Sequence, residues 1–353
     1  SVVNLSSNNY LGLTTHPHLR EKAIEAIERF GAGSGSVRTI AGTMAIHMEL
    51  EARLAAFKKT EAVVVFQSGF TANAGTVSSI LGRDDVIVSD ELNHASIIDG
   101  ARLSRAAIKV FPHKDVHAAR AILRGLPAGQ KTLLITDGVF SMDGDLGPVD
   151  ALAALAEEYG AIMMVDDAHA SGVFGANGRG TVDHFGMHGR VDIQVGTLSK
   201  AIGALGGYVA GTRTLIEFLY HRARPFLFST SHPPAVAAAC LAALDILEQQ
   251  PELIERLWAN TRFFKEGLAA LGFNTGISES PITPVIAGES GLAMKLSDRL
   301  FEEGVFAQGI AYPTVARDKA RVRTIVTATH TRDELQFALD MFAKVGRELG
   351  IIS

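Results

Sequence analysis

The feature that most constrains the fold is a series of short apolar runs separated by stretches with helical periodicity. This rhythm is typical of mostly parallel strands joined by crossover helices, so the sequence predicts an α/β fold with a mostly parallel central sheet. A further strand is expected at residues 207–210. The runs cover residues 63–66, 86–88, 108–111, 133–136 and 161–165.

The pattern changes from about Pro233 onward. Long amphipathic helices are predicted over residues 235–249 and 252–271, then short strands near 283–286 and 322–326, and a closing helix over 332–349. This shift indicates a smaller α+β domain at the C-terminus. We therefore expect an N-terminal segment over residues 1–45, a large domain over 46–235 that carries the site, and a small domain over 236–353.

Composition excludes several classes of protein. With 353 residues, 47% of them hydrophobic, the chain can bury a large core. Its net charge of −5 provides no general attraction to nucleic acid or anionic membranes. Cys240 is the only cysteine, so no internal disulfide is possible, and a reducing cytoplasm fits best. No apolar run approaches the roughly 20 residues of a membrane span and no signal sequence opens the chain, which predicts a soluble cytoplasmic protein.

Two segments carry groups suited to covalent chemistry. Lys200 ends the segment Thr197-Leu198-Ser199-Lys200, which follows an apolar run and a glycine. The buried run at residues 161–165 ends in Asp166-Asp167-Ala168-His169, where strands of open α/β sheets meet their ligands. An amine, a buried carboxylate and an imidazole together suggest Schiff-base chemistry.

A candidate anion site follows the first predicted strand. Ser68-Gly69-Phe70-Thr71 leads from that strand into a helix, whose free backbone N–H groups and dipole attract a phosphate. The alternative is an ordinary strand-to-helix turn. Thr197 would add a hydroxyl to the same anion, and Ser229-Thr230-Ser231 offers further donors.

Three more residues have both a functional and a structural interpretation. His94 lies between a strand and a helix, where a histidine is more often a capping or packing residue. Ser141 follows another strand and would hydrogen-bond a ligand oxygen or simply form a polar turn. Arg323 alternates with apolar residues in a strand; it is suited to bidentate carboxylate binding, although a surface salt bridge is the default.

Two patterns are set aside. The glycines of residues 31–35 follow a probable helix at 17–30 rather than a strand, so they do not form a dinucleotide-binding loop. Asp166, Asp167 and His169 lack a second cluster at a suitable spacing, so no metal site is expected.

Taken together, the motifs resemble those of the α-oxoamine synthases, which are pyridoxal-phosphate enzymes of the aspartate-aminotransferase fold type I. The resemblance runs from about Asn4 to Ile351. It rests on motifs that occur in the family's order: Asn8-Asn9-Tyr10-Leu11-Gly12, Ser68-Gly69-Phe70, Asn93-His94-Ala95-Ser96, residues 137–144, Val165-Asp166-Asp167-Ala168-His169 and Thr197-Leu198-Ser199-Lys200.

The resemblance implies a role for each candidate residue. Lys200 would bind pyridoxal 5'-phosphate covalently and later act as the base, with Asp166 on the pyridine nitrogen and His94 stacked on the ring. His169 and Ser141 would hydrogen-bond the phenolic oxygen. Gly69, Phe70 and Thr197 would bind the phosphate. In a homodimer, Ser229 and Thr230 would bind the phosphate of the neighbouring subunit. Asn8 and Arg323 would bind the amino-acid carboxylate.

The resemblance also implies the reaction, an acyl transfer from an acyl-CoA to an amino acid with release of CoA. Segments 93–100, 281–285 and 320–331 favour the glycine C-acetyltransferase branch, which joins glycine and acetyl-CoA to give 2-amino-3-oxobutyrate in threonine and glycine metabolism. The alternative is the 8-amino-7-oxononanoate synthase branch, in which alanine and a pimeloyl thioester react with decarboxylation to form a biotin precursor. One enzyme that accepts both pairs is a further alternative.

Rival functions remain in other classes. An aminotransferase or aldolase of the same fold type would share the lysine and the aspartate but would release no CoA. A pyridoxal-phosphate-binding regulator would need an added DNA-binding segment. A nicotinamide-dependent oxidoreductase would need a strand before its glycine loop. Family members usually carry an arm before the Asn8 motif, so residues 1–45 are expected to be a truncated N-terminal segment.

Overall fold

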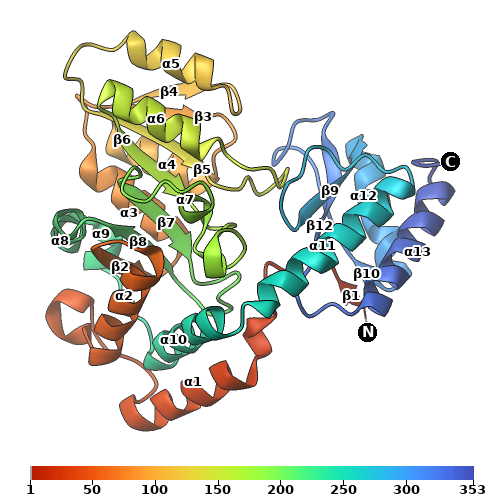
Figure 1. Ribbon diagram of the computed structural model, residues 1–353, viewed down its shortest axis with the longest axis horizontal. Coiled ribbons are helices and arrows are strands. Elements are labelled where there is room, and N and C mark those ends of the chain that lie inside the picture. The colour runs from red at the N-terminus through yellow and green to blue at the C-terminus, as the bar shows by residue number, and fades with distance from the viewer. Residues whose placement is uncertain (1) are drawn as a thin grey trace. The chain divides into compact units, whose positions relative to one another are not determined.

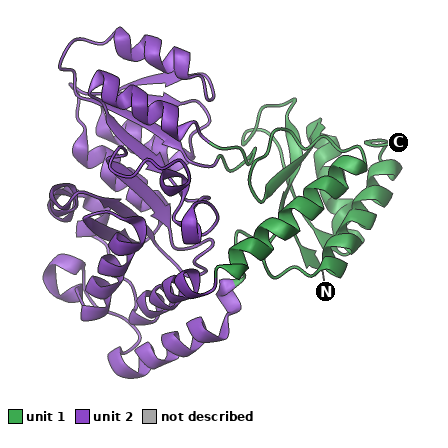
Figure 2. Ribbon diagram, in the orientation of Figure 1, with its two compact units in different colours: residues 1–12, 140–146, 251–353 green, residues 13–139, 147–250 purple. Residues whose placement is uncertain are grey.

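The structure is a computed structural model that describes residues 2–353, and it divides into two compact units (Figure 2). The large unit comprises residues 13–139 and 147–250. The small unit comprises the residues up to Gly12, residues 140–146 and residues 251–353. The division expected at residue 235 falls inside helix α10 (Pro234–Gln249), which groups with the large unit because it packs against helices α1 (Pro17–Phe30) and α2 (Ala45–Lys58).

A seven-stranded sheet forms the centre of the large unit (Figure 1). Its spatial order is β2-β8-β7-β6-β5-β3-β4, and only β8 runs antiparallel to its neighbours. The predicted, mostly parallel α/β sheet is therefore confirmed. The strands are β2 (Ala62–Phe66), β3 (Val86–Asp90), β4 (Ala107–Phe111), β5 (Thr132–Asp137), β6 (Ile162–Asp166), β7 (Ile193–Thr197) and β8 (Gly207–Gly211).

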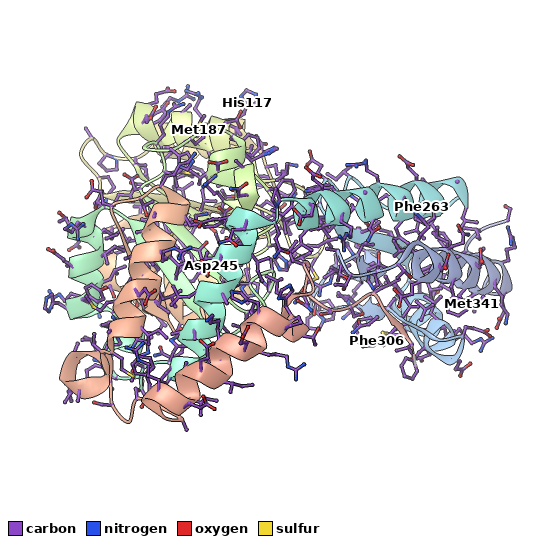
Figure 3. The ribbon with its side chains drawn as sticks, turned by 60° about the horizontal axis from the view of Figure 1, so that its bottom comes forward. His117, Met187, Asp245, Phe263, Phe306 and Met341 are labelled. Carbon is purple, nitrogen blue, oxygen red and sulfur yellow. The ribbon has the colours of Figure 1, made fainter. Side chains whose placement is uncertain are left out.

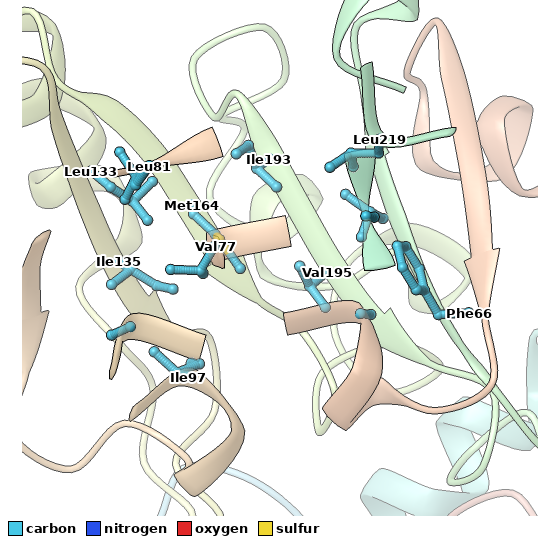
Figure 4. Packing of buried hydrophobic residues seen from close by; sticks show 14 of the residues in the cluster. Phe66, Val77, Leu81, Ile97, Leu133, Ile135, Met164, Ile193, Val195 and Leu219 are labelled. Carbon is cyan, nitrogen blue, oxygen red and sulfur yellow. The ribbon is translucent and has the colours of Figure 1, made fainter. Parts of the chain in front are cut away.

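Alternation along the central strands sends apolar side chains to both faces of this sheet. On β6, Met164 joins the core of one face, whereas Met163 and Val165 join the core of the other. The first core, drawn in Figure 4, lies under α3 (Gly69–Ile80), α4 (Ala95–Ser104), α8 (Arg213–Arg222) and α9 (Arg224–Leu227). The second lies under α5 (Val116–Arg124), α6 (Val149–Tyr159) and α7 (Thr181–His184). Burial on both faces explains why the strands are continuous apolar runs in the sequence.

Strand β7 was not predicted. Gln194 and Gly196 interrupt its apolar run, although both residues are buried inside the sheet. A Cβ on Gly196 would lie 2.4 Å from the Tyr208 ring of β8, so the neighbouring strand requires glycine at that position. Outside the sheet, Arg53 of α2 pairs with Asp245 of α10 at 2.8 Å; Asp245 is labelled in Figure 3.

Helix α1 ends where the sequence predicts. Gly31 caps it with φ of 87°, a conformation that favours glycine, and this confirms that the glycines of residues 31–35 begin with a helix stop.

The small unit is built on a three-stranded antiparallel sheet in the order β11-β12-β9. Its strands are β9 (Ile282–Gly288), β11 (Gln308–Ile310) and β12 (Ala320–Ile325). Beside it, β1 (Val3–Asn4) pairs in parallel with β10 (Val305–Phe306). Helices α11 (Glu252–Ala270), α12 (Ser290–Glu302) and α13 (Arg332–Glu348) supply the apolar core; Phe263 and Met341, labelled in Figure 3, pack against it. Among the described residues, no helix is both long enough and apolar enough to cross a membrane.

Candidate active site

Polar side chains gather where the parallel strands of the large unit end. Asp137 is the last residue of β5 and lies opposite Asp166, the last residue of β6, while β7 ends at Thr197. Because parallel strands end at one edge of a sheet, these residues share the edge at which open α/β sheets bind ligands.

Asp166 is a buried carboxylate held only by neutral donors. Its Oδ2 accepts from Asn73 Nδ2 at 2.6 Å, and its Oδ1 accepts from the backbone N–H of Ala168 at 2.8 Å. It is 4% exposed, and within residues 2–353 no cation lies at ion-pair distance from it. Such a carboxylate is suited to a cationic partner supplied by a ligand.

Asp167 next to it is fully neutralised within the protein. Its Oδ2 pairs with Lys58 Nζ at 3.1 Å, both side chains are completely buried, and Thr181 donates to its Oδ1 through the hydroxyl and the backbone N–H. Although burial acts to lower it, Tyr208 and Asp167 raise the pKa of Lys58 above its usual value. Asp167 is therefore a structural residue of the turn that follows β6.

His169 lies in that same turn and is 7% exposed. The turn is closed by two backbone hydrogen bonds to the Asp167 carbonyl, from Ala170 at 3.0 Å and from Ser171 at 2.8 Å. The structure thus places His169 directly after the carboxyl end of β6, and its predicted contact with a ligand stays a prediction.

His94 caps helix α4, so the structural interpretation of this residue is correct. Its Nδ1 accepts from the backbone N–H of Ser96 at 3.2 Å, while the residue as a whole remains exposed. Partial burial lowers the pKa of His94, the negative charge of Asp166 opposes that effect, and the positive charge of Lys200 adds to it. Capping and ligand binding are compatible, because the cap uses one edge of the imidazole and leaves the ring faces open.

Lys200 is half-buried in the loop between β7 and β8. The loop is held by the backbone N–H of Leu198, which donates to the Gly206 carbonyl at 2.8 Å, and by Thr197 Oγ1, which donates to the same carbonyl at 2.9 Å. The charge of Lys200 acts on both His94 and Asp137, which places the amine at the strand-end cluster.

Asp137 is a second buried carboxylate that the sequence interpretation gave no role. Its Oδ2 accepts from the backbone N–H of His94 at 3.1 Å. Burial, and then the neighbouring charge of Asp166, hold the pKa of Asp137 well above its usual range.

The N-terminus of α3 forms a candidate phosphate cradle. Ser68 caps the helix through a reciprocal pair of hydrogen bonds with Thr71, and the backbone N–H groups of Gly69 and Phe70 precede any intrahelical acceptor. A Cβ on Gly69 would lie 3.5 Å from the Thr197 Cβ, so the Thr197 hydroxyl borders the same helix end. Thr230 lies near this helix end in space, since its carbonyl accepts from Gln67 Nε2 at 2.8 Å, and Ser229 precedes it in the chain.

The small unit holds the other predicted residues, in particular two arginines on β12. Arg321 is 2% exposed and pairs with Asp143 Oδ1 at 2.6 Å. Arg323 is half-buried, and among the described residues its guanidinium donates only to the Ser141 carbonyl, 3.1 Å from Nη1. Burial lowers the pKa of Arg323 against the opposing effect of Tyr10. The surface salt bridge considered for Arg323 is therefore wrong.

Asn8, in the same unit, has a buried side-chain oxygen with no hydrogen-bond partner within residues 2–353. Its segment contacts the residues that follow β12, because the Tyr10 carbonyl accepts from the backbone N–H of Ala328 at 2.7 Å. An unpaired buried amide oxygen and an arginine without a carboxylate partner are both groups that a ligand would complete.

Sequence reasoning missed the role of Asn73. The only signal for it was one carboxamide in an otherwise small and apolar stretch of α3, one turn after Gly69. Lys58, 109 residues from Asp167 along the chain, had no sequence signal, since nothing in its surroundings distinguishes it from the exposed Lys59.

The chemistry of these groups fits one type of cofactor. A carboxylate without a counter-ion suits a protonated ring nitrogen, an amine suits a carbonyl carbon, and a helix N-terminus suits a phosphate. The donors present in the large unit therefore fit pyridoxal phosphate, the cofactor that the resemblance implies. Within residues 2–353, no group of three or more His, Cys, Asp or Glu side chains is placed to hold a metal ion.

Comparisons with known proteins agree with this geometry. The family model for aminotransferase class I and II matches residues 1–342. The chain is 64% identical over 352 residues to an 8-amino-7-oxononanoate synthase from Symbiobacterium thermophilum, covering 99% of this chain and 90% of that protein. It is 59% identical to 8-amino-7-oxononanoate synthase 1 of Bacillus subtilis, with the same coverage.

Solved structures also match nearly the whole chain, at lower sequence identity. A serine palmitoyltransferase from S. paucimobilis with bound PLP superposes with a TM-score of 0.97 at 34% identity, covering 99% of this chain and 89% of that one. An 8-amino-7-oxononanoate synthase from Francisella tularensis gives a TM-score of 0.84 at 30% identity, covering 99% and 98%.

These relatives correct the predicted substrate pair. The preference for glycine and acetyl-CoA is wrong, because relatives that are 54–64% identical over the whole chain bear the name of the alternative, 8-amino-7-oxononanoate synthase. The segments that favoured it were uninformative for a physical reason. Residues 93–100 and 320–331 include His94 and Arg323, whose implied partners are the cofactor and the amino-acid carboxylate, and residues 281–285 lie almost wholly in β9, so the segments concern groups that both branches share rather than the acyl group.

The motifs, the sheet-edge cluster and the comparisons agree: the chain belongs to the aminotransferase class I and II family and, within it, to the α-oxoamine synthases, which are acyltransferases.

Proposed function

We propose that this chain is an 8-amino-7-oxononanoate synthase that joins alanine to a pimeloyl thioester. The proposed chemistry rests on the cluster of Lys200, Asp166 and His94 at one sheet edge, beside a helix N-terminus. The substrate pair is supported by the names of relatives that match 99–100% of the chain. Pyridoxal phosphate is the cofactor, and when bound it supplies an electron sink for negative charge at the α-carbon of the amino acid.

The large unit would hold this cofactor through groups of matched charge. Asp166, already fixed by two N–H donors, would pair with the ring nitrogen, and the open ring of His94 would stack on the cofactor. His169 would hydrogen-bond its phenolic oxygen, and the family resemblance gives Ser141 the same role. The phosphate would be bound by the backbone N–H groups of Gly69 and Phe70 and by Thr197.

Lys200 would perform the proton transfers. Its Nζ would bind the cofactor in the resting enzyme and, once alanine has displaced it, accept the α-proton. The neutral state of His94 supports this role, because a second cation beside the amine would oppose its protonation.

Arg323 and Asn8 would bind the alanine carboxylate. The guanidinium of Arg323 has only a neutral carbonyl partner, so a carboxylate would supply the missing negative charge. The Asn8 amide would add an N–H donor to the same carboxylate.

In the proposed reaction, each bond that forms is matched by one that breaks. The α-carbon of alanine forms a bond to the thioester carbonyl carbon while the C–S bond breaks, and the thiol leaves with a proton equivalent to the one removed from alanine. The bond from the α-carbon to the carboxylate then breaks, carbon dioxide leaves, and a proton from solvent replaces it at the α-carbon.

We also propose that the active unit is a homodimer in which Ser229 and Thr230 contact the phosphate bound in the partner. These residues follow α9, they are half-buried and exposed respectively, and their hydroxyls make no hydrogen bond to the described part of the chain. Sedimentation equilibrium should give twice the chain mass, and a monomer with full activity would contradict this proposal.

Release of free thiol tests the function directly. We expect release with alanine and pimeloyl-CoA, and much less with glycine and acetyl-CoA. Lys200→Ala should lower turnover by at least about 10³-fold and abolish the absorbance of the lysine-bound cofactor. The exposed Lys131→Ala is the matched control and should behave like the wild type. Thiol release from glycine and acetyl-CoA alone, or unchanged turnover in Lys200→Ala, would contradict the proposal.

A further inference from the structure

Four side chains of the large unit form one continuous hydrogen-bonded chain. Asn73 Nδ2 donates to Asp166 Oδ2 at 2.6 Å and to Ser96 Oγ at 2.9 Å. Ser96 Oγ in turn lies 2.7 Å from His94 Nδ1. The carboxylate at the end of β6 and the imidazole at the start of α4 are thus connected through two residues to which the proposed function gives no role.

Close packing of α3 against α4 makes this connection possible. Asn73 lies in the second turn of α3, and Ser96 lies in the first turn of α4. Gly100, one turn further along α4, has no side chain; a Cβ there would lie 3.0 Å from the Ala74 Cα and 3.2 Å from the Asn73 carbonyl oxygen. The absence of a side chain at Gly100 brings Ser96 within reach of the Asn73 amide.

The direction of each hydrogen bond is fixed by chemistry. The backbone N–H of Ser96 donates to His94 Nδ1 at 3.2 Å, so this nitrogen is the unprotonated acceptor. The Ser96 hydroxyl therefore donates its proton to the same nitrogen, and its oxygen accepts from Asn73. The proton of the neutral imidazole is left on Nε2.

Asn73 carries a free-energy cost at this position. It is 1% exposed, and its Oδ1 has no hydrogen-bond partner within residues 2–353. An unpaired buried carbonyl costs about 1–3 kcal/mol, which an apolar side chain would avoid. The two N–H donors of the amide offset this cost. The reverse amide orientation would place its oxygen against the Asp166 carboxylate, where both atoms are acceptors.

We propose that Asn73 is a positioning residue that couples Asp166 to His94 through Ser96, so that one amide fixes both the carboxylate facing the ring nitrogen and the tautomer of the stacking imidazole. The proposal rests on the proposed function, because it takes the cluster to be the cofactor site. Asn73 contacts neither the cofactor nor the substrate and acts only through these two residues.

Cofactor affinity of the purified enzyme tests this coupling. Asn73→Ala should weaken pyridoxal phosphate binding by about tenfold or more, because it removes a hydrogen bond to a buried charge. Ser96→Ala should weaken it less. Ser78→Ala is the matched control, since Ser78 lies on the same helix and bonds only the Ala74 carbonyl; its affinity should stay within about twofold of the wild type.

A double-mutant cycle separates coupling from independent effects. In the Asn73→Ala background, Ser96→Ala should cost less than it does in the wild type, because its connection to Asp166 runs through Asn73 and only its direct hydrogen bond to His94 is left to lose. Additive effects of the two substitutions would overturn the proposal. If Asn73→Ala does not fold, Ser96→Ala alone decides: wild-type affinity in that variant overturns the proposal, and weakened affinity supports it.

The absorbance of the lysine-bound cofactor supplies a readout that general destabilisation would not move. Without the Asn73 donor, the charge of Asp166 is less compensated, so the pH midpoint of the absorbance change should move upward. An unchanged midpoint together with wild-type affinity in Asn73→Ala would overturn the inference. Absence of any lysine-bound absorbance in the wild type would instead overturn the proposed function.

Discussion

The end of β6 in the large unit and strand β12 in the small unit each carry two like charges, and each unit neutralises only one of them. Asp167 is paired with the buried Lys58, and Arg321 is paired with Asp143. Their neighbours Asp166 and Arg323 have only neutral hydrogen-bond partners.

This difference separates structural charges from those kept for ligands. A buried charge without a counter-ion is unfavourable unless a ligand supplies one. The large unit leaves a carboxylate, which suits the cationic ring nitrogen of a cofactor. The small unit leaves a guanidinium, which suits the carboxylate of an amino acid. The sign of each remaining charge thus indicates the sign of the group that would bind there.

The largest effect is expected from breaking the neutralised pair. Lys58→Met should lower the free energy of unfolding by about 3–5 kcal/mol, because it leaves Asp167 buried and unpaired. The adjacent Lys59→Met is the matched control, since Lys59 is half-exposed and should contribute at most about 1 kcal/mol. Urea unfolding measures both. Adding Asp167→Asn to Lys58→Met should restore much of the loss; equal losses in the two lysine variants would contradict the distinction.

Neutralising the other carboxylate should give the opposite pattern. Asp166→Asn should lower turnover by roughly 10²- to 10³-fold, because the ring nitrogen loses its charged partner. The thermal stability of the cofactor-free protein should be unchanged or higher, since an uncompensated buried charge is removed. Turnover assays and melting curves on the same preparation test both halves. A melting temperature that falls as far as that of Lys58→Met would show that Asp166 is structural.

The two arginines provide the corresponding test in the small unit. Arg323→Met should raise KM for the amino acid by about 10- to 100-fold, because a charge-assisted hydrogen bond to its carboxylate is lost. Stability should change little. Arg321→Met is the control: it should destabilise the protein by about 1–3 kcal/mol with KM nearly unchanged. Steady-state kinetics with varied alanine decides, and a KM effect confined to Arg321→Met would reverse the two assignments.

A smaller effect concerns a buried group with neither a counter-ion nor a ligand. Within residues 2–353, His232 Nε2 has no hydrogen-bond partner, and burial lowers the pKa of His232 to about 4. The unfolded chain, with a histidine pKa near 6.5, therefore binds more protons between pH 6.5 and 4, and stability falls as pH falls through this window. Between pH 7 and pH 5, His232 should cost about 2 kcal/mol. His232→Gln should remove that part of the slope in urea unfolding at the two pH values; an unchanged slope would contradict the assignment.

Much of the fold was predictable because burial leaves a strong local pattern. Strands buried on both faces are short apolar runs, and β2, β3, β5 and β6 were located from such runs. The edge strand β4 was located from its apolar run too, although four of its five residues are exposed, and β8 was expected from residues 207–210. Strand β7 was missed because Gln194 and Gly196 interrupt its apolar run, and the glycine is required by the Tyr208 ring of the neighbouring strand. The boundary near residue 235 was drawn at a change of pattern inside α10, whose packing against α1 and α2 is not visible in its own residues.

The candidate site divides in the same way. Lys200, Asp166, His94 and Gly69 follow strands, and their residue types suggested a cofactor site that the structure brings together. The reaction was predicted at the level of the family, but the substrate pair was wrong, because the segments used to choose it carry the cofactor and amino-acid groups that both branches share.

The sequence by itself determined the α/β class, the strand ends that carry reactive side chains and the family. Each of these depends on patterns among residues that lie close together in the chain. Only the tertiary structure decided which charges are neutralised. Lys58 meets Asp167 and Asn73 meets Asp166 across gaps of 109 and 93 residues. Coulomb and hydrogen-bond energies depend on distances of a few ångströms in space, and separation along the chain does not record those distances.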